Sequence, residues 1–174
     1  MIKSNTYLKK LTLENYIRNQ RHYLLTSRFN SDTWEQNKRF RLEKKIDCIY
    51  CSPDPISQRI PIDSVMFILE MNNDSNRIMG IGMVRNRAVV NRYIVYMEGN
   101  YNRFNFIGKN RIDRTEMTEK EEEVMKAFDI LCFTGNKHMK RGQGLKSFPI
   151  EMLFNCSKKL DLVDFIREMF KRRI

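Results

Sequence analysis

The chain has 174 residues and a formal net charge of +11, from 32 lysines and arginines against 21 acidic residues. This length fits one ordinary domain. A content of 41% hydrophobic and 11% aromatic residues can fill a core, which excludes wholesale disorder. We find no apolar run of about 18 residues, and residues 1–10 lack the apolar region of a secretory signal. The composition therefore predicts an intracellular, cytoplasmic, basic protein, and it names no reaction.

Residues 1–46 predict a basic helical leader. Thr12 is a candidate cap for a first helix, whose apolar positions continue to Leu24. Ser31 or Asp32 is a candidate cap for a second helix, in which Trp34 lies among lysines and arginines. The prolines between residues 53 and 61 then predict a loop, because proline is excluded from a helix interior.

Residues 47–149 predict a sheet that contains a basic glycine loop. Apolar runs at 64–71 and 77–84 flank turn residues at 72–76, the pattern of a hairpin. Gly80 and Gly82 fall on one face of the second run, where another group can approach the backbone closely. Residues 93–97 and 103–107 are two further strand candidates.

The C-terminal part predicts more helix. Thr118 and Glu121 have capping-box spacing and start a helix expected to run to about residue 129. A short strand at 130–133, a glycine loop at 135–149 and an amphipathic helix at 160–172 follow, with residues 150–174 closing the chain. We predict one α+β domain: a small, mostly antiparallel sheet or partly open barrel, with N-terminal helices and a C-terminal amphipathic helix.

The chain has four cysteines and no secretory signal, which indicates reduced thiols. Cys48 and Cys51 have the CxxC spacing that can place two thiolates on zinc. Turn residues follow them rather than the helix expected of a redox motif. We predict buried or incidental cysteines and no cofactor. The alternative is a zinc site formed from Cys48, Cys51, Cys132 and His138, or completed by Cys156.

The positive charge is concentrated in residues 85–114, with a net charge of +5, and in residues 137–146, with +4. Cations neutralise phosphates, and aromatic faces stack on unpaired bases. The candidate nucleic-acid-binding residues of the first segment are Arg85, Arg87, Arg92, Tyr93, Tyr101, Arg103, Phe104, Lys109 and Arg111. The alternative for the aromatic residues is that they face the core while the arginines face solvent.

The second basic segment lies in a loop whose glycines can present backbone N–H groups to an anion. Its candidate nucleic-acid-binding residues are Lys137, His138, Lys140, Arg141 and Lys146. Neither this loop nor Gly80-Ile-Gly82 matches a complete nucleotide-binding motif. His138 has the chemistry of a general base, although a single histidine in a basic loop is more often a solvated or phosphate-contacting donor.

No catalytic residue can be assigned. The carboxylates form no DxD or HxxE pattern, and a Cys132–His138 pair would have to meet across a loop. An enzyme that processes nucleic acid through His138 and a carboxylate is the least supported function.

The segment from Val65 to Val84, with its Gly80-Ile-Gly82 ending, is similar to the hairpins of PUA-like barrels, the group that includes the EVE and ASCH domains. That resemblance implies a small barrel that binds RNA or modified nucleotides. The aromatic cage used by EVE-type domains has no counterpart, since Trp34 is the only tryptophan and lies in the predicted leader. The richness in asparagine, isoleucine and lysine resembles proteins of large cytoplasmic DNA viruses, which implies a host-cytoplasm or virion setting.

The favoured function is nucleic-acid binding, with RNA favoured over DNA. Phosphate contacts would supply affinity. Bases stacked on Tyr93, Tyr101 or Phe104 would give a modest preference. The alternative is a viral structural or protein-interaction component that binds an acidic partner. Phe165, Met169 and Phe170 of the terminal helix would support that alternative if they were exposed.

Overall fold

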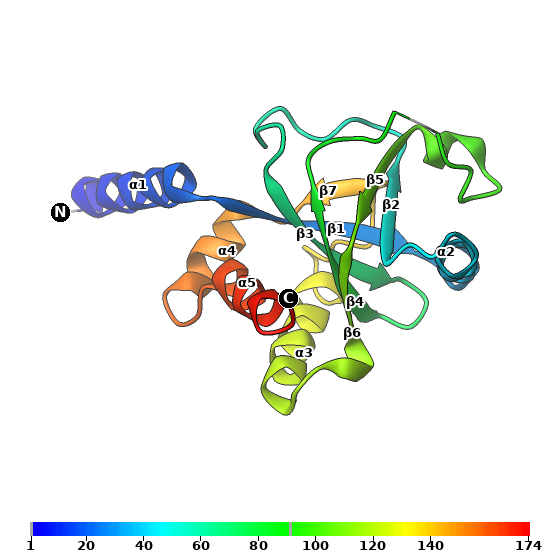
Figure 1. The fold of residues 1–174 in the computed structure, drawn as a ribbon. Helices are drawn as coiled ribbons and strands as arrows, with labels where there is room; N and C mark the ends of the chain where they lie inside the picture. The colour runs from blue at the N-terminus through cyan, green and yellow to red at the C-terminus, as the bar shows by residue number, and fades with distance from the viewer. Residues whose placement is uncertain (1, 91) are drawn as a thin grey trace.

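The computed structural model describes residues 2–90 and 92–174, which form an α+β fold with an open five-stranded sheet and a two-stranded sheet (Figure 1). The α-helices are α1 (Ile2–Asn19), α2 (Ser31–Lys44), α3 (Glu119–Phe133), α4 (Ile150–Ser157) and α5 (Leu162–Lys171). The strands are β1 (His22–Phe29), β2 (Cys48–Ser52), β3 (Val65–Asn72), β4 (Arg77–Arg85), β5 (Phe104–Gly108), β6 (Asn110–Asp113) and β7 (Leu145–Ser147). Short 3-10 turns occur at Gly99–Asn102 and Arg114–Glu116.

The large sheet has the strand order β6-β4-β3-β1-β7. Only β1 and β3 are parallel; the other neighbours are antiparallel. The predicted α+β class, the mostly antiparallel sheet and the β3–β4 hairpin are therefore confirmed. The sheet stays open, with β6 and β7 as its edges, so it is not closed into a barrel.

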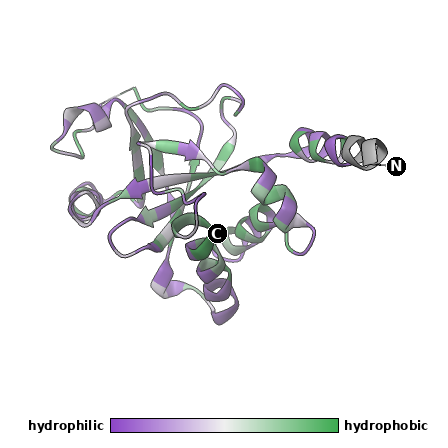
Figure 2. Cartoon of the chain, turned by 180° about the vertical axis from the view of Figure 1, so that it is seen from behind, coloured by the Kyte–Doolittle hydropathy of each residue, from purple (hydrophilic) through white to green (hydrophobic). Residues whose placement is uncertain are grey.

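Both faces of the large sheet are covered, and successive residues of β3 enter different cores. Phe67 and Leu69 pack in a core with α3, α4 and α5, whereas Met66 and Ile68 pack in a second core with α2, β2 and β5. Burial on both faces explains why β3 is a continuous apolar run rather than an alternating one. Figure 2 shows the apolar residues concentrated in these strands and in the helices packed on them.

The prediction of a purely helical leader was wrong. His22–Phe29 forms β1, which lies inside the sheet and pairs with β3 along its whole length. Leu24 and Leu25 enter opposite cores, as they must on a strand covered on both faces. Thr12 lies within α1 rather than at its start. The second helix is confirmed, although its cap is Asn30, whose side chain accepts a hydrogen bond from Thr33 N at 2.8 Å.

The elements after residue 85 were predicted in part. The Thr118 capping box is confirmed, but α3 continues through residues 130–133, which were predicted as a strand. Residues 93–97 form no strand; Asn102 Oδ1 instead accepts hydrogen bonds from Val95 N and Tyr96 N, both at 3.0 Å. β5 and α5 confirm the strand at 103–107 and the terminal helix. Neither β7 nor α4 was anticipated.

The two ends of the chain differ in their attachment. Figure 1 shows α1 extending away from the sheet, with its C-terminal end beside α4, where Tyr16 and Phe154 have ring centroids 5.6 Å apart. α5 instead packs on the sheet, and Met169 and Phe170 are 0% and 2% exposed. The apolar face of the terminal helix is therefore used within the fold.

Candidate nucleic-acid interface

Arg85 ends β4, Arg87 follows it, and both contact Asp63. Arg85 Nη1 donates to the backbone oxygen of Asp63 at 2.9 Å, and Arg87 Nη2 lies 2.6 Å from Asp63 Oδ2. Asp63 itself has a positive φ of 65°, in a turn that places it beside both arginines. This surface is thus partly neutralised, although the Arg87 side chain remains 71% exposed.

Arg111 requires a correction, because the structure places it inside the fold rather than on a basic surface. Its side chain is 9% exposed, and it donates from Nε and Nη2 to the carboxylate of Glu70, which is 1% exposed, with a shortest distance of 2.6 Å. Arg111 Nη1 also lies 2.8 Å from Asp113 Oδ2. Burial alone would lower the pKa of Arg111, but Glu70 holds that pKa above its usual value. This guanidinium is committed to carboxylates and leaves the candidate surface.

The three candidate aromatic residues are all half-buried and pack against the core around β2 and β5. Tyr93 packs edge-on against Phe40, with ring centroids 5.8 Å apart, and Phe104 packs at the margin of the core around β2 and β5. Tyr101 packs against Tyr96 at 6.4 Å and also lines a cavity. The core-facing alternative therefore describes Tyr93 and Phe104 well, and Tyr101 is the aromatic residue best placed for a ligand.

The glycine loop is fixed at the ends of β1 and β3. Met139 N donates to Cys132 O at 2.7 Å, Arg28 Nε donates to Met139 O, and Asn73 Nδ2 donates to Lys140 O at 3.1 Å. Lys140 Nζ reaches Asn76 Oδ1 at 2.8 Å. The glycines at positions 135, 142 and 144 all have positive φ, which a residue with a side chain adopts only with strain. The loop is consequently held in one shape.

His138 is half-buried in this loop, and its Nδ1 lies 3.4 Å from Lys140 N. No group of three or more histidine, cysteine or acidic residues in the described part of the chain is placed to hold a metal ion. The contact that the structure shows for the His138 ring is therefore with the backbone of its own loop.

A cavity of about 240 Å³ lies between the glycine loop, the start of α2 and the residues before β5. We call it the β1-end cavity; it is lined by Ser27, Arg28, Phe29, Asn30, Thr33, Cys51, Asn73, Tyr96, Glu98, Tyr101, Gly142, Gln143 and Gly144. It joins the two predicted basic segments, because Tyr101 comes from the first and Gly142–Gly144 from the second. Leu145 N also donates to Ser52 Oγ at 3.4 Å, which brings the glycine loop to the end of β2.

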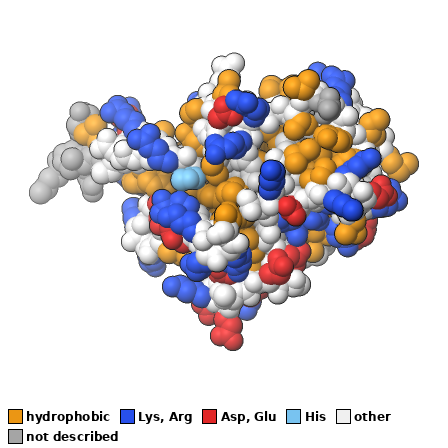
Figure 3. Space-filling view, viewed as in Figure 1, with side chains coloured by type: hydrophobic (Ala, Val, Ile, Leu, Met, Phe, Trp, Pro, Cys, Tyr) orange, Lys and Arg blue, Asp and Glu red, His pale blue; other side chains and the backbone are white. Residues whose placement is uncertain are grey.

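The structure separates the remaining candidates. In the β2–β5 pair, Ser52 is opposite Phe104, and Cys48 is opposite Gly108. Arg103 therefore lies at the glycine-loop end of the ribbon, and Lys109 at the opposite end. Six candidates are exposed and form no ion pair among the described residues: Arg85, Arg92, Arg103, Lys109, Lys137 and Arg141. Lys146 lies 3.8 Å from Asp54, and the side chains of both are about half exposed. On the face in Figure 3, lysines and arginines are interspersed with acidic and apolar side chains.

Arg28 and Asn73 line the cavity and were missed by the sequence analysis. Arg28 belongs to β1, which was predicted as helix, so its position at a strand end could not be seen. The available signal was the change from the apolar Tyr23-Leu-Leu to Thr26-Ser-Arg, followed by the helix cap Asn30.

The zinc alternative is not supported by the placement of its candidates. Cys48 and Cys51 lie in the core around β2, whereas Cys132 lies in the core on the opposite face of the sheet. Burial raises the pKa of each of these three thiols to about 12, which opposes the thiolate form that zinc requires.

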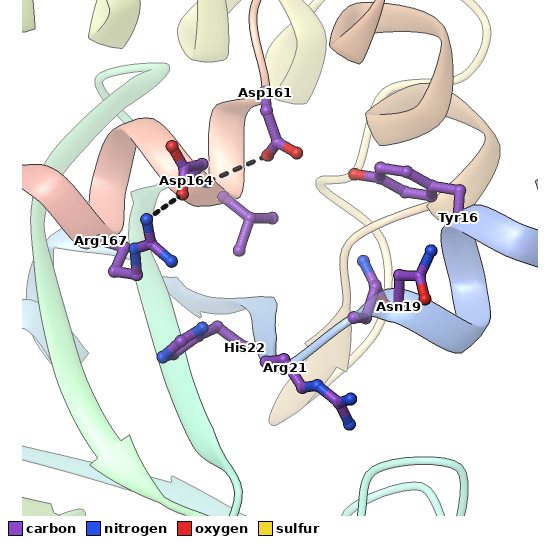
Figure 4. Close-up of a pocket in the computed structure, with 9 residues that line it drawn as sticks. Tyr16, Asn19, Arg21, His22, Asp161, Asp164 and Arg167 are labelled. Atoms are coloured by element: carbon purple, nitrogen blue, oxygen red, sulfur yellow. Dashed lines mark hydrogen bonds and ion pairs between the residues drawn. The ribbon is translucent and has the colours of Figure 1, made fainter.

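A second cavity, of about 190 Å³, lies between the end of α1 and the start of α5 (Figure 4). His22, Asp164 and Arg167 contribute to it, and Arg167 forms an ion pair with Asp164. Burial, followed by the charge of Arg167, lowers the pKa of His22. The His22 ring stacks on Phe67 with a centroid distance of 5.7 Å, so it also serves the core.

Comparisons of the chain with protein-family models, with curated proteins and with solved structures gave no match. No helix in the described residues is long and apolar enough to cross a lipid bilayer. The case for a function consequently rests on the geometry of the cavity and on the charges around it.

Proposed function

We propose that the protein binds nucleic acid, with single-stranded RNA favoured, through a surface beside the β1-end cavity. We call this the loop surface; it comprises Tyr101, Arg103, Lys137, Lys140, Arg141 and Lys146. The observation that carries the proposal is that Tyr101 and the glycine loop line one cavity, although they come from separate parts of the chain. Cations and an aromatic ring side by side can bind the phosphates and an unpaired base of one strand.

The charges of the loop surface support a weakly specific, salt-dependent interaction. Arg103, Lys137 and Arg141 are exposed and free of carboxylate partners among the described residues. Such cations release counterions from nucleic acid when they contact phosphates, so affinity falls as salt rises. Arg87 and Arg111 contribute less, because each already forms an ion pair, with Asp63 and Glu70 respectively.

The test is fluorescence anisotropy with labelled single-stranded RNA, single-stranded DNA and duplexes, across a range of salt concentrations. Lys137→Ala/Arg141→Ala should weaken binding and reduce the slope of log affinity against log salt by about two phosphate contacts. Lys120→Ala/Lys126→Ala is the matched control, because it removes two exposed lysines of α3 and the same charge. Equal losses in the two variants, or no binding at low salt, would contradict the proposal.

The alternative of a protein partner now has different support. Met169 and Phe170 are buried, so the terminal helix no longer favours it. The apolar side chains of Ile62, Val90, Ile94 and Met97 are instead 79–98% exposed, and Figure 3 shows apolar side chains gathered over the region of β2 and β5. Exposed apolar surface favours protein contacts. Sedimentation of the wild type and of Ile94→Ser/Met97→Ser at several concentrations tests association of the chain with itself, which the substitutions should reduce.

A further inference from the structure

Arg28 is a half-buried cation near the end of β1, and one of its guanidinium nitrogens is unpartnered. Nε donates to the backbone oxygen of Met139, but Nη1 is inaccessible to solvent and has no hydrogen-bond partner. Among the described residues, no carboxylate forms an ion pair with Arg28. Burial lowers the pKa of this guanidinium, which shows that its surroundings disfavour the charge. A partly desolvated charge with an unfilled donor is costly, and an anionic ligand would lower that cost.

Asn73 contributes the complementary group. Its Nδ2 is used by Lys140 O, while Oδ1 is buried and has no partner. Arg28 and Asn73 both line the β1-end cavity, and they hold two of the three buried unpartnered side-chain atoms in the described residues. An unfilled donor and an unfilled acceptor at one cavity fit a ligand that carries both an anionic oxygen and a hydroxyl or amino group.

The rest of the cavity suits the same kind of ligand. Gly142 and Gly144 line the cavity with φ values of 100° and 65°, a backbone conformation that a residue with a side chain adopts only with strain. Tyr101 supplies an aromatic ring, and Gln143 a side-chain amide that forms no hydrogen bond within the described structure. Glu98 also lines the cavity and disfavours an anion at its own position, so we expect the anionic group at the Arg28 end. The volume of about 240 Å³ is close to the lower range of small-molecule pockets.

We propose that the β1-end cavity binds the phosphate of a nucleotide, with Arg28 as the cationic ligand and Asn73 accepting from a hydroxyl or amino group of the same nucleotide. This proposal extends the proposed function. It rests on that function only if the bound nucleotide is part of a nucleic-acid strand. The phosphate could come from a free nucleotide or from the end of a nucleic-acid strand, and both carry the same chemistry.

The first experiment measures thermal unfolding with added inorganic phosphate or nucleoside 5′-monophosphates, at constant ionic strength maintained with chloride. Binding to the folded state raises the melting temperature. Arg28→Met keeps most of the side-chain volume but removes the charge and the hydrogen bond to Met139 O, so its melting temperature without ligand is measured first as its own baseline. It should bind about tenfold or more weakly, because a charge-assisted hydrogen bond is lost. Arg39→Met is the control, since Arg39 is exposed on α2 and forms no ion pair in the described structure.

The outcomes are distinct. Stabilisation of the wild type and of Arg39→Met, but not of Arg28→Met, supports the site. No response of the wild type to any of these ligands overturns it, and so does an equal response in all three proteins. If Arg28→Met fails to fold, Arg28→Lys keeps the charge with fewer donors and should weaken binding less. Titration calorimetry of the wild type with the same nucleotides then decides whether the site exists.

A second experiment separates the two sources and the two proposals. Single-stranded oligonucleotides with a 5′-phosphate and with a 5′-hydroxyl are compared with free nucleotides in binding to the wild type and Arg28→Met. A preference for the 5′-phosphate that is lost in Arg28→Met assigns the cavity to a strand end. If free nucleotides bind but no strand does, the cavity stands and the proposed function fails. If strands bind equally to both proteins and free nucleotides bind to neither, the loop surface stands and the cavity proposal fails.

Discussion

The hydroxyl of Tyr50 occupies the space that a side chain at Gly82 would fill. That hydroxyl donates to Glu70 Oε1 at 2.7 Å, and Arg111 Nε donates to the same oxygen at 2.9 Å. A side chain at Gly80 would likewise lie 2.7 Å from Arg111 Nη2 and 2.8 Å from Glu70 Oε2. The two glycines of β4 thus leave room for a buried Tyr–Glu–Arg network. The spacing of the two glycines predicted that another group approaches the backbone closely there. In the structure, that group is a set of side chains of the protein itself.

Gly82→Ala should destabilise the protein by about 2–4 kcal/mol, because the added methyl group displaces Tyr50 in a closely packed interior. Gly99→Ala is the control: a side chain there meets nothing within 4 Å, and we expect a change of less than about 0.5 kcal/mol. Urea unfolding of both variants measures the difference. Similar free energies of unfolding in the two variants would contradict the packing described for Tyr50 and Gly82.

The ion pair between Glu70 and Arg111 should show strong coupling. Either single change, Glu70→Met or Arg111→Met, leaves a buried charge without its partner and should cost about 3–5 kcal/mol. The double variant removes both charges and should cost clearly less than the sum of the two. A double-mutant cycle from urea unfolding gives the coupling energy. Additive losses would show that water or Asp113 already compensates each charge.

The hairpin was predictable from the sequence because all of its information is local. Two apolar runs flank Asn72-Asn-Asp-Ser-Asn76, and Asn72 Oδ1 accepts hydrogen bonds from Asp74 N and Ser75 N within that turn. β1 was not predictable in this way, because its parallel pairing with β3 crosses a long connection. The apolar pattern of a strand buried on both faces resembles that of a buried helix over so short a length.

The candidate site could be predicted only by residue type. The excess of cations at 85–114 and 137–146 indicated an anion-binding surface, but pairing depends on tertiary contacts that sequence does not contain. Arg111 of β6 meets Glu70 of β3 across β4, and Arg87, which follows β4, meets Asp63, which precedes β3. Arg28 has the opposite property. It lies in a segment predicted as helix, and only the fold shows that its Nη1 is inaccessible to solvent and has no hydrogen-bond partner.

Arg173 should matter more for stability than its neighbour Arg172. Both contact Glu121, which is 1% exposed, but Arg173 makes two contacts, at 2.7 and 2.9 Å, and is 28% exposed, against 55% for Arg172. Arg173→Ala should cost about 1–3 kcal/mol, and Arg172→Ala at most about 1 kcal/mol. Thermal unfolding of the two variants at neutral pH gives the comparison, and a larger loss for Arg172→Ala would contradict it.

The contact of Glu121 with Arg172 and Arg173 predicts that part of the stability of the fold is lost at acidic pH. Burial would raise the pKa of Glu121, but Arg173, Thr118 N and Arg172 together lower it from 4.5 to about 2. Because the folded state favours the carboxylate, its contribution is complete above pH 4.5 and is lost as pH falls toward 2. Arg173→Ala should reduce this loss between neutral pH and about 3. An unchanged pH profile in that variant would assign the acid sensitivity to other carboxylates.

The four thiols should react at very different rates. Cys48, Cys51 and Cys132 are 0–5% exposed, and burial raises their pKa values to about 12, so little reactive thiolate forms at neutral pH. Cys156 is only half-buried. Alkylation of the native protein with iodoacetamide, followed by mass spectrometry, should modify Cys156 first and the other three only on unfolding.

Cys156→Ser should abolish the fast modification while leaving the slow ones unchanged. Fast modification of Cys48 or Cys51 would instead show that the β2 edge opens in solution, which would contradict its burial between β5 and the large sheet.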